Sequence, residues 1–349
     1  MSPELQLIAD LCSRAFVGAD IRRVDVAPDV DWDRVLQLAR FHRVQGLLSH
    51  SLTTYGAFLP PATAKALSAE GRAIAMNNLR VATECREIRS DFDAAGVPLI
   101  FLKGLTLGAL AYSKSLLKMG WDIDVLVAPD RIGTAGEILR RRGYHLSMPE
   151  GVGKLERWHR QRKESLWAHD SGLFVELHSR LADNLRLIPS VDINSPTRNV
   201  EVVEGIRLPT LQDDDLFAYL CVHGASSAWF RLKWITDLAG FIHGRPAPEI
   251  ERLYVRSQEL GAYRAADQAL LLADAIYGSL EGTGLRSSVG RDPVSQRLFR
   301  AAMRQLSDAR EPTGRPLGTW RIHWTQLLLK PGMDFKVGEA FRQVRDAIA

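Results

Sequence analysis

Apolar residues recur at helical spacing through the first quarter of this 349-residue chain. Residues 31–56 follow the helical period, with a break near Gly46. Residues 60–96 open on two prolines, which suit a helix entrance, and stop at Gly96, so they predict one long helix or two in sequence. Residues 1–95 are therefore predicted to form an N-terminal helical region.

The pattern changes between residues 96 and 209, where short apolar strands alternate with helices. Single strands and helices are expected at residues 97–102, 104–113, 122–127 and 129–146. Two hairpins are expected at residues 165–181, turning at Asp170-Ser171-Gly172, and at residues 199–209, turning around Glu204-Gly205. This block is the predicted α/β core.

Helical spacing returns in residues 210–349, the predicted C-terminal helical domain. Thr210 followed by Asp213 suggests a capping box, after which residues 213–244 continue at the helical period. Helical spacing recurs at residues 262–278 and 294–307. The predicted class is therefore α+β, with a mixed core between two helical regions.

Composition narrows the function classes only modestly. The formal net charge of +4 suits a protein that handles phosphates without demanding nucleic acid. Cys12, Cys85 and Cys221 lack the spacing of a zinc site or a disulfide framework. The N-terminus carries acidic residues and no signal pattern, and no apolar run reaches the ~20 residues of a membrane span. A soluble cytoplasmic protein is expected.

One pair of acids, Asp122 and Asp124, lies inside a predicted strand. The same spacing occurs at Asp29–Asp33, before a helix, and at Asp91 and Asp93, near a helix end. On a strand, residues i and i+2 share a face, so both carboxylates point one way while Ile123 and Val125 point into the core. Two oxygen ligands so placed suit Mg²⁺. The alternative is a strand start with two solvated acids.

A second acid follows the same rule fifty residues later. Glu176 and His178 share one face of the strand at residues 174–178, opposite Val175 and Leu177. Glu176 on a neighbouring strand would complete a three-carboxylate site for phosphoryl transfer. His178 is either its supporting partner or a strand histidine with its own hydrogen bonds.

Two further stretches carry polar candidates. Lys103 and Gly104 end a strand that turns into a helix, where backbone N–H groups, Lys103 and the Thr106 hydroxyl could receive a phosphate. Otherwise Gly104 serves only the turn. Later polar residues form a strip that either faces a substrate or belongs to a core helix with a structural Arg/Asp pair: His223, Arg231, Lys233 and Asp237.

Together these residues resemble an uncharacterised bacterial family of nucleotidyltransferases in the polymerase-beta-like superfamily. The likeness is most specific between Val97 and Asp237. It rests on these positions: Lys103-Gly104, Tyr112, Lys118, Asp122-Ile123-Asp124, Gly143-Tyr144, His178, His223, Trp229, Leu232, Trp234 and Asp237. The sequence departs from the family pattern in four ways. Thr106 is offset from the usual serine, and the second histidine expected after His223 is replaced. Gly104 precedes Asp122 by eighteen residues, and Lys118 stands where the family often has arginine, which loses bidentate phosphate binding.

The resemblance implies a polymerase-beta-like core in which Asp122, Asp124 and Glu176 hold Mg²⁺ or Mn²⁺. Gly104 and its neighbours would cradle the triphosphate of an NTP, with ATP among the candidates, and Glu176 would help to activate the acceptor hydroxyl. The expected reaction transfers an NMP to an unidentified small molecule, protein or RNA end and releases pyrophosphate. No membrane or DNA partner is expected.

Two other functions remain open at this point. The first is a catalytically inactive nucleotide-binding or scaffold protein that retains the fold. The second is a toxin that modifies tRNA, whose expected dense basic surface is not evident in the sequence.

Overall fold

The computed structural model describes residues 1–17, 26, 29–55, 59–112, 114–149, 155–314 and 318–348. Four helices precede the sheet: α1 (Pro3–Val17), α2 (Trp32–His42), α3 (Gln45–Tyr55) and α4 (Pro61–Ala94). The segment predicted as one helix or two is thus a single helix. The earlier break falls at Arg43, which has a φ of +57°, whereas Gly46 lies inside α3.

One residue of the acidic cluster at residues 29–33 caps a helix. The Asp31 carboxylate accepts a hydrogen bond from the backbone N–H of Arg34 at 3.0 Å, at the start of α2. This satisfies one of the donors that every helix leaves free in its first turn.

The central sheet has five strands in the order β1-β2-β5-β4-β3. They are β1 (Ile100–Phe101), β2 (Asp122–Leu126), β3 (Tyr144–Met148), β4 (Glu164–His169) and β5 (Phe174–His178). β2 and β5 are parallel, and the other pairs are antiparallel. The predicted hairpin at residues 165–181 is β4–β5, and its turn lies at residues 170–172 as expected.

Short helices connect these strands: α5 (Leu105–Ala111), α6 (Ile132–Arg141) and α7 (Leu155–Gln161), with 3₁₀ turns η1 (Ser115–Leu117) and η2 (Pro129–Arg131). A separate antiparallel hairpin consists of β6 (Thr197–Val203) and β7 (Ile206–Leu211), and it turns at Glu204-Gly205 as predicted. The mixed sheet with its helices confirms the α+β class, while the likeness of this core to polymerase beta stays a prediction.

The C-terminal part is helical, although its start differs from the expectation. Thr210 lies in β7, and α8 begins at Asp213 after Gln212, with no side-chain hydrogen bond at the cap. The predicted capping box is therefore wrong. The Asp213 carboxylate instead pairs with Arg198 at 2.8 Å and with Arg245 at 3.0 Å, which fixes the helix start against neighbouring elements.

The helices of this part are α8 (Asp213–Ser226), α9 (Leu232–Ile242), α10 (Ala247–Leu260), α11 (Arg264–Tyr277), α12 (Pro293–Leu306), α13 (Trp320–Gln326) and α14 (Met333–Ile348), with 3₁₀ turns η4 (Gly284–Ser287) and η5 (Pro312–Gly314). The stretch at residues 213–244, predicted to continue at helical period, is interrupted between α8 and α9. Ala228 and Trp229 both have positive φ there. Trp229 packs fully buried against Gly224, where a Cβ would lie 2.4 Å from the indole.

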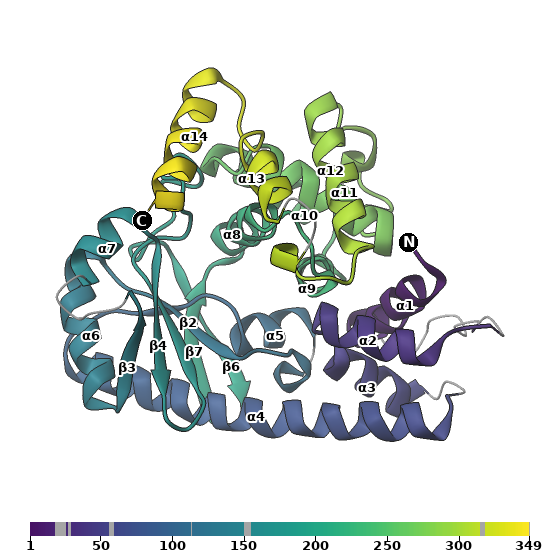
Figure 1. Ribbon diagram of the computed structural model, residues 1–349, viewed down its shortest axis with the longest axis horizontal. Helices are drawn as coiled ribbons and strands as arrows, with labels where there is room; N and C mark the ends of the chain where they lie inside the picture. The colour runs from purple at the N-terminus through teal and green to yellow at the C-terminus, as the bar shows by residue number, and fades with distance from the viewer. Residues whose placement is uncertain are drawn as a thin grey trace.

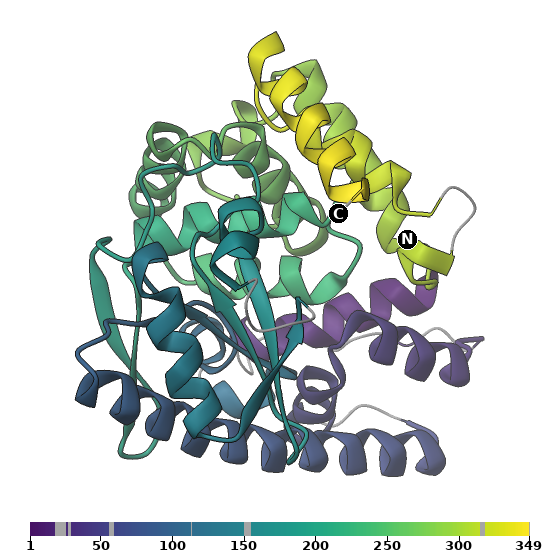
Figure 2. The same ribbon diagram turned by 60° about the vertical axis from the view of Figure 1, so that its left-hand side comes forward.

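Helix α4 runs along the base of the molecule, beneath the sheet and the N-terminal helices (Figures 1 and 2). Its first half packs on α3, and its second half packs on α6 and the β6–β7 hairpin. The second half buries Val81, Ile88 and Phe92 against the sheet. This one helix therefore joins the N-terminal helices to the core.

The two faces of the sheet contribute to different cores. Ile123, Val125 and Leu177 lie in the cluster between the sheet, α4 and α6. Leu126 belongs to the larger cluster, which also contains residues of α1–α3 and α8–α12. Because the N- and C-terminal helices share that cluster, the division of the chain at residues 95 and 209 stays a prediction. Within the described chain, no helix is both long enough and apolar enough to cross a membrane.

Candidate active site

The parallel pairing of β2 with β5 places the acidic residues side by side. Asp124 lies opposite Glu176 in the register, and Asp122 lies opposite Phe174. Strand alternation sends Asp122, Asp124 and Glu176 to the face that α8 and α9 cover, while Ile123 and Val175 enter the opposite core. The local pattern of the sequence sets the face, and the register between the strands brings Asp124 and Glu176 together.

Asp124, Glu176 and His178 form a compact group of potential ligands. One donor atom from each lies within 4.8 Å of the others. His178 Nε2 is 3.2 Å from Asp124 Oδ1 and 3.6 Å from Glu176 Oε2. The His178 side chain is fully buried, and its Nδ1 lies 3.3 Å from Glu164 Oε2 on β4. Asp122 lies one pleat away on the same face, outside this group.

Lys103 contributes the positive charge closest to Asp124. Its Nζ lies 2.8 Å from Asp124 Oδ1, and both side chains are largely buried. Burial alone would lower the pKa of Lys103, but the Asp124 carboxylate raises it well above its usual range. Burial alone would raise the pKa of Asp124, but the Lys103 ammonium and His178 hold it well below its usual range. The pair is therefore ionised at neutral pH.

The neighbouring carboxyl of Glu176 behaves differently. Burial and the adjacent negative charge of Asp124 raise the pKa of Glu176 to about 7, against the opposing effect of its hydrogen bond to His178. Burial would lower the pKa of His178, but Glu164, Asp124 and Glu176 raise it. Two carboxylates on adjacent strands thus have pKa values that differ widely, which is typical of active sites.

A pocket opens beside this group, between the sheet and helices α8 and α9. Its lining includes Gly104, Asp122, Asp124, Lys103, Lys118, His223, Lys233, Trp234 and Asp237. Three lysines and three aspartates therefore face one small space. Such a concave site with perturbed titratable groups is the default candidate for an active site.

Lys118 is fixed at the wall of this pocket by an ion pair with α9. Its Nζ lies 2.5 Å from Asp237 Oδ2, and the Tyr112 hydroxyl donates to Asp237 Oδ1 at 2.8 Å. Asn78 of α4 donates to the Lys118 carbonyl at 2.8 Å. Helices α4 and α9 thus hold Lys118 in place, and Tyr112 orients the aspartate that pairs with it.

Lys233 and His223 lie in the same pocket in a dehydrated setting. Burial lowers the pKa of Lys233 to about 7, and the positive charges of Lys118 and Arg43 add to the effect. Burial, together with the nearby ammonium of Lys103, lowers the pKa of His223 well below its usual range. His223 is therefore neutral at physiological pH, with its ring 5.8 Å from that of Trp234.

Comparison with known proteins identifies the family. A family model described as an uncharacterised nucleotidyltransferase matches residues 28–278, from α2 to the end of α11. The chain belongs to this nucleotidyltransferase family. The resemblance inferred from the sequence is thereby confirmed, and the match covers every residue of the pocket. No curated protein matches the chain.

Two residues that the sequence analysis assigned to substrate binding in this nucleotidyltransferase lie elsewhere. The Thr106 hydroxyl is buried and donates to the Lys103 carbonyl at 3.1 Å. Arg231 lies between the rings of Phe41 and Phe230, with its guanidinium carbon 5.0 and 5.1 Å from their centroids.

The predicted Arg/Asp pair on the later helix is not formed. Arg231 donates to the Phe41 carbonyl and pairs with Glu311, whereas Asp237 pairs with Lys118. Gly104 lines the pocket with a φ of +65°, a conformation that side-chain-bearing residues rarely adopt. It therefore shapes the turn through its backbone freedom.

Sequence reasoning missed Glu164, which contacts His178 from β4. The hairpin turn at residues 170–172 contained the signal, because an antiparallel hairpin centred on Ser171 pairs residues equidistant from it. Glu164 and His178 are such a pair. Lys163, the neighbour of Glu164 in the chain, forms an ion pair with it.

Proposed function

We propose that this protein is a metal-dependent nucleotidyltransferase that transfers an NMP from an NTP to an acceptor hydroxyl and releases pyrophosphate. The observation that carries the proposal is the grouping of Asp124, Glu176 and His178, whose donor atoms lie within 4.8 Å on adjacent parallel strands. Membership of the nucleotidyltransferase family supports the reaction class.

The donor set fits a divalent cation. Asp124 and Glu176 supply the carboxylate oxygens that Mg²⁺ or Mn²⁺ prefers, and His178 supplies an imidazole nitrogen. Asp122, on the same face of β2, would complete the ligand set implied by the family resemblance. When bound, the ion supplies positive charge that offsets the negative charge of the phosphates.

Lysines around the pocket provide the complementary surface for a triphosphate. Lys103, Lys118 and Lys233 all line it. With a pKa of about 7, Lys233 is only partly charged at neutral pH in the free protein, and an adjacent phosphate would favour its charged form. We assign these three residues to nucleotide binding, with Gly104 allowing close approach.

Glu176 is suited to take the proton from the acceptor hydroxyl. The pKa of Glu176 in the free protein is about 7; a bound divalent cation would lower it, so Glu176 would face the acceptor hydroxyl as an ionised carboxylate. Next to it, the Asp124 carboxylate stays ionised. The acceptor is a small molecule, a protein side chain or an RNA end.

The rival function is a nucleotide-binding or scaffold protein without turnover. One contact favours it: Lys103 already neutralises Asp124, so the buried charge is satisfied without a metal. The two functions differ in whether Asp124 exchanges Lys103 for a divalent ion when a nucleotide binds.

The test measures Mn²⁺ binding and pyrophosphate release from labelled NTPs with candidate acceptors. Asp124→Asn should abolish Mn²⁺ binding. Glu176→Gln should lower the rate by about 10²- to 10⁴-fold, the range for loss of a general base. The control is Glu201→Gln on β6, an exposed acid whose partner is Arg207. Nucleotide binding without turnover for any acceptor would favour the rival function. No nucleotide binding at all would contradict both.

A further inference from the structure

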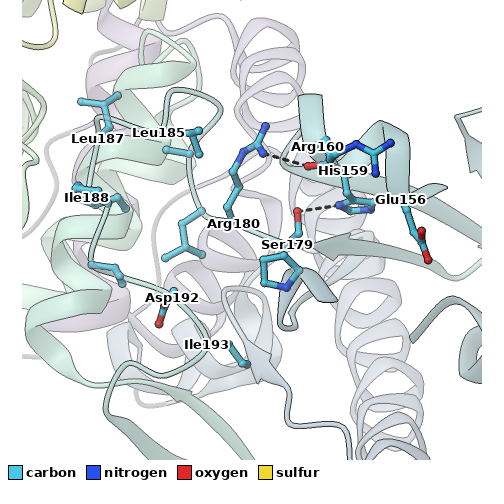
Figure 3. A pocket seen from close by; sticks show the side chains of 15 residues that line it. Glu156, His159, Arg160, Ser179, Arg180, Leu185, Leu187, Ile188, Asp192 and Ile193 are labelled. Atoms are coloured by element: carbon cyan, nitrogen blue, oxygen red, sulfur yellow. Dashed lines mark hydrogen bonds between the residues drawn. The ribbon is translucent and has the colours of Figure 1, made fainter. Parts of the chain in front are cut away.

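A second cavity lies beyond the end of β5, outside the pocket around Asp124. Its volume is about 340 Å³, within the range of ~300–1,000 Å³ that is typical of small-molecule sites. Its walls come from α7, from the end of β5 and from the loop at residues 181–193 (Figure 3). None of its lining residues also lines the first pocket.

Arg180 reaches into this space from the end of β5. Figure 3 shows its side chain between the loop that carries Leu185 and Ile188 and the helix that carries His159. Arg180 Nη1 donates to the His159 carbonyl at 3.1 Å, and Nε is buried without an acceptor. Among the residues that the structure describes, no carboxylate forms an ion pair with this guanidinium.

The described charged groups around Arg180 form no ion pair with it. The carboxylates of Asp183 and Asp346 and the guanidiniums of Arg342 and Arg345 act on the partly buried Arg180 side chain only from a distance. A half-buried charge without a counter-ion is costly, because the desolvation of the guanidinium is not repaid by a partner. The cavity therefore has a guanidinium in its wall that lacks a directly paired carboxylate among the described residues.

An apolar wall completes the cavity. Leu185 and Ile188 lie on the loop, on the other side of Arg180 from His159 (Figure 3). Arg160 also lines the cavity, but its side chain extends away from Arg180 (Figure 3). This combination favours a ligand with one anionic end and one aliphatic end.

The two acids at the rim do not neutralise Arg180. The Asp192 carboxylate accepts a hydrogen bond from the backbone N–H of Asn194 at 2.8 Å and so closes its own turn. Glu156 lies on the far side of His159 from Arg180 (Figure 3). The Arg180 guanidinium thus stays available to a ligand.

We propose that this cavity binds a small organic anion, whose carboxylate or phosphate group pairs with Arg180 and whose aliphatic part packs on Leu185 and Ile188. The site is independent of the metal-ligand group and does not rest on the proposed transfer reaction.

The first test is calorimetric titration of the full chain with four probes: hexanoate, hexyl phosphate, hexylamine and inorganic phosphate. Hexanoate and hexyl phosphate should bind, and the tighter of the two identifies the preferred anionic group. Inorganic phosphate should bind more weakly because it lacks the aliphatic part, and hexylamine should not bind. Equal binding of hexylamine and hexanoate, or no binding of any probe, would overturn the proposal.

Substitutions at Arg180 and Leu185 locate the binding. Arg180→Met keeps the chain length and should weaken hexanoate or hexyl phosphate about tenfold or more, as expected for a charge-assisted hydrogen bond. Arg180→Lys should restore part of the affinity. Leu185→Ser should weaken hexanoate and leave inorganic phosphate unchanged, and this exposed position allows the test if Arg180→Met does not fold. The matched control is Arg198→Met, an arginine that pairs with Asp213 outside this cavity. Unchanged affinity for hexanoate in both Arg180→Met and Leu185→Ser would contradict the assignment.

Discussion

The two faces of the β2–β5 strand pair differ completely, although their residues alternate along the same strands. One face carries Ile123, Val125 and Leu177, all packed against α4 and α6. The other face carries Asp124 and Glu176, which lie beside a polar pocket under α8 and α9. The apolar face stabilises the fold through burial, whereas the polar face costs desolvation and is held together by ion pairs.

Side chains that stabilise the fold and side chains that form the candidate active site therefore occupy adjacent positions along the same strand. Glu176 and Leu177 are neighbours in the chain, yet one titrates near neutral pH and the other is fully buried in the apolar core. A substitution at the apolar position should therefore lower stability and leave activity unchanged, whereas a substitution at the adjacent polar position should do the reverse. Three experiments test whether the two faces of the sheet have these separate roles.

The largest effect is expected from Leu177→Ala. Removal of a fully buried leucine side chain should lower the free energy of unfolding by about 2–5 kcal/mol, measured by urea denaturation. Pyrophosphate release per folded molecule should stay close to that of the wild type, because the side chain points away from the pocket. Glu176→Gln should show the reverse. A catalytic loss in Leu177→Ala as large as that in Glu176→Gln would contradict the separation of the faces.

An intermediate effect is expected from His159 of α7, whose buried side chain should make the stability of the fold depend on pH. Burial lowers the pKa of His159 to about 4, and its ring nitrogens lie 2.9 Å from the Ser165 and Ser179 hydroxyls. The unfolded chain binds a proton at this position near pH 6.5 and the folded chain only near pH 4. The folded state should therefore lose up to about 3 kcal/mol as the pH falls from 6.5 to 4.

The measurement for His159 is urea denaturation across that pH range, for the wild type and for His159→Gln. The wild type should lose stability more steeply with falling pH than the variant, in which this group cannot titrate. Equal slopes would show that His159 does not contribute to the pH dependence.

The smallest effect is expected at Lys103, whose ammonium group would compete with a divalent cation for the Asp124 carboxylate. Lys103 Nζ occupies Asp124 Oδ1, an oxygen that a divalent ion would use. Lys103→Met removes a positive charge that would repel the bound ion. Two charges ~4 Å apart interact by several kcal/mol at an effective dielectric constant near 20. Part of this gain is offset by structural relaxation, so Mn²⁺ should bind about tenfold more tightly to the variant.

The control for Lys103 is Lys163→Met, which removes a buried lysine that contacts Glu164 rather than Asp124. Calorimetry of Mn²⁺ binding to both variants distinguishes the loss of the direct contact with Asp124 from the loss of any nearby positive charge. An equal change in the two would show that the contact with Asp124 does not matter.

Much of the fold follows from local patterns in the sequence. The β4–β5 and β6–β7 hairpins and the strand β2 were predicted, because each has a clear period and local turn residues. The helical character of residues 61–94 was also predicted, but the sequence left open whether they form one helix or two. The capping box at Thr210 was wrong because strand β7 extends through Thr210 to Leu211. Pairing with β6 outweighed the short capping pattern.

The candidate site was predicted only in part. Asp124 and Glu176 meet as expected, since period-two alternation put each on the correct face. His178 and Glu164 join them through pairings between strands, and Lys103 joins Asp124 from the end of β1. Helical periodicity put Arg231 and Asp237 on one strip, but the break at Ala228 and Trp229 separates α9 from α8 and directs Arg231 toward Phe41.

By itself, the sequence determined which residues are helical or extended and which side of each strand is polar, because these depend on neighbours a few positions away. It also carried the family pattern, from Lys103 to Asp237. Only the tertiary structure decided the parallel register that sets Asp124 beside Glu176, the pairing of Lys103 with Asp124, and the cavity around Arg180. These depend on contacts between segments far apart in the chain, whose geometry is set by packing of the whole core.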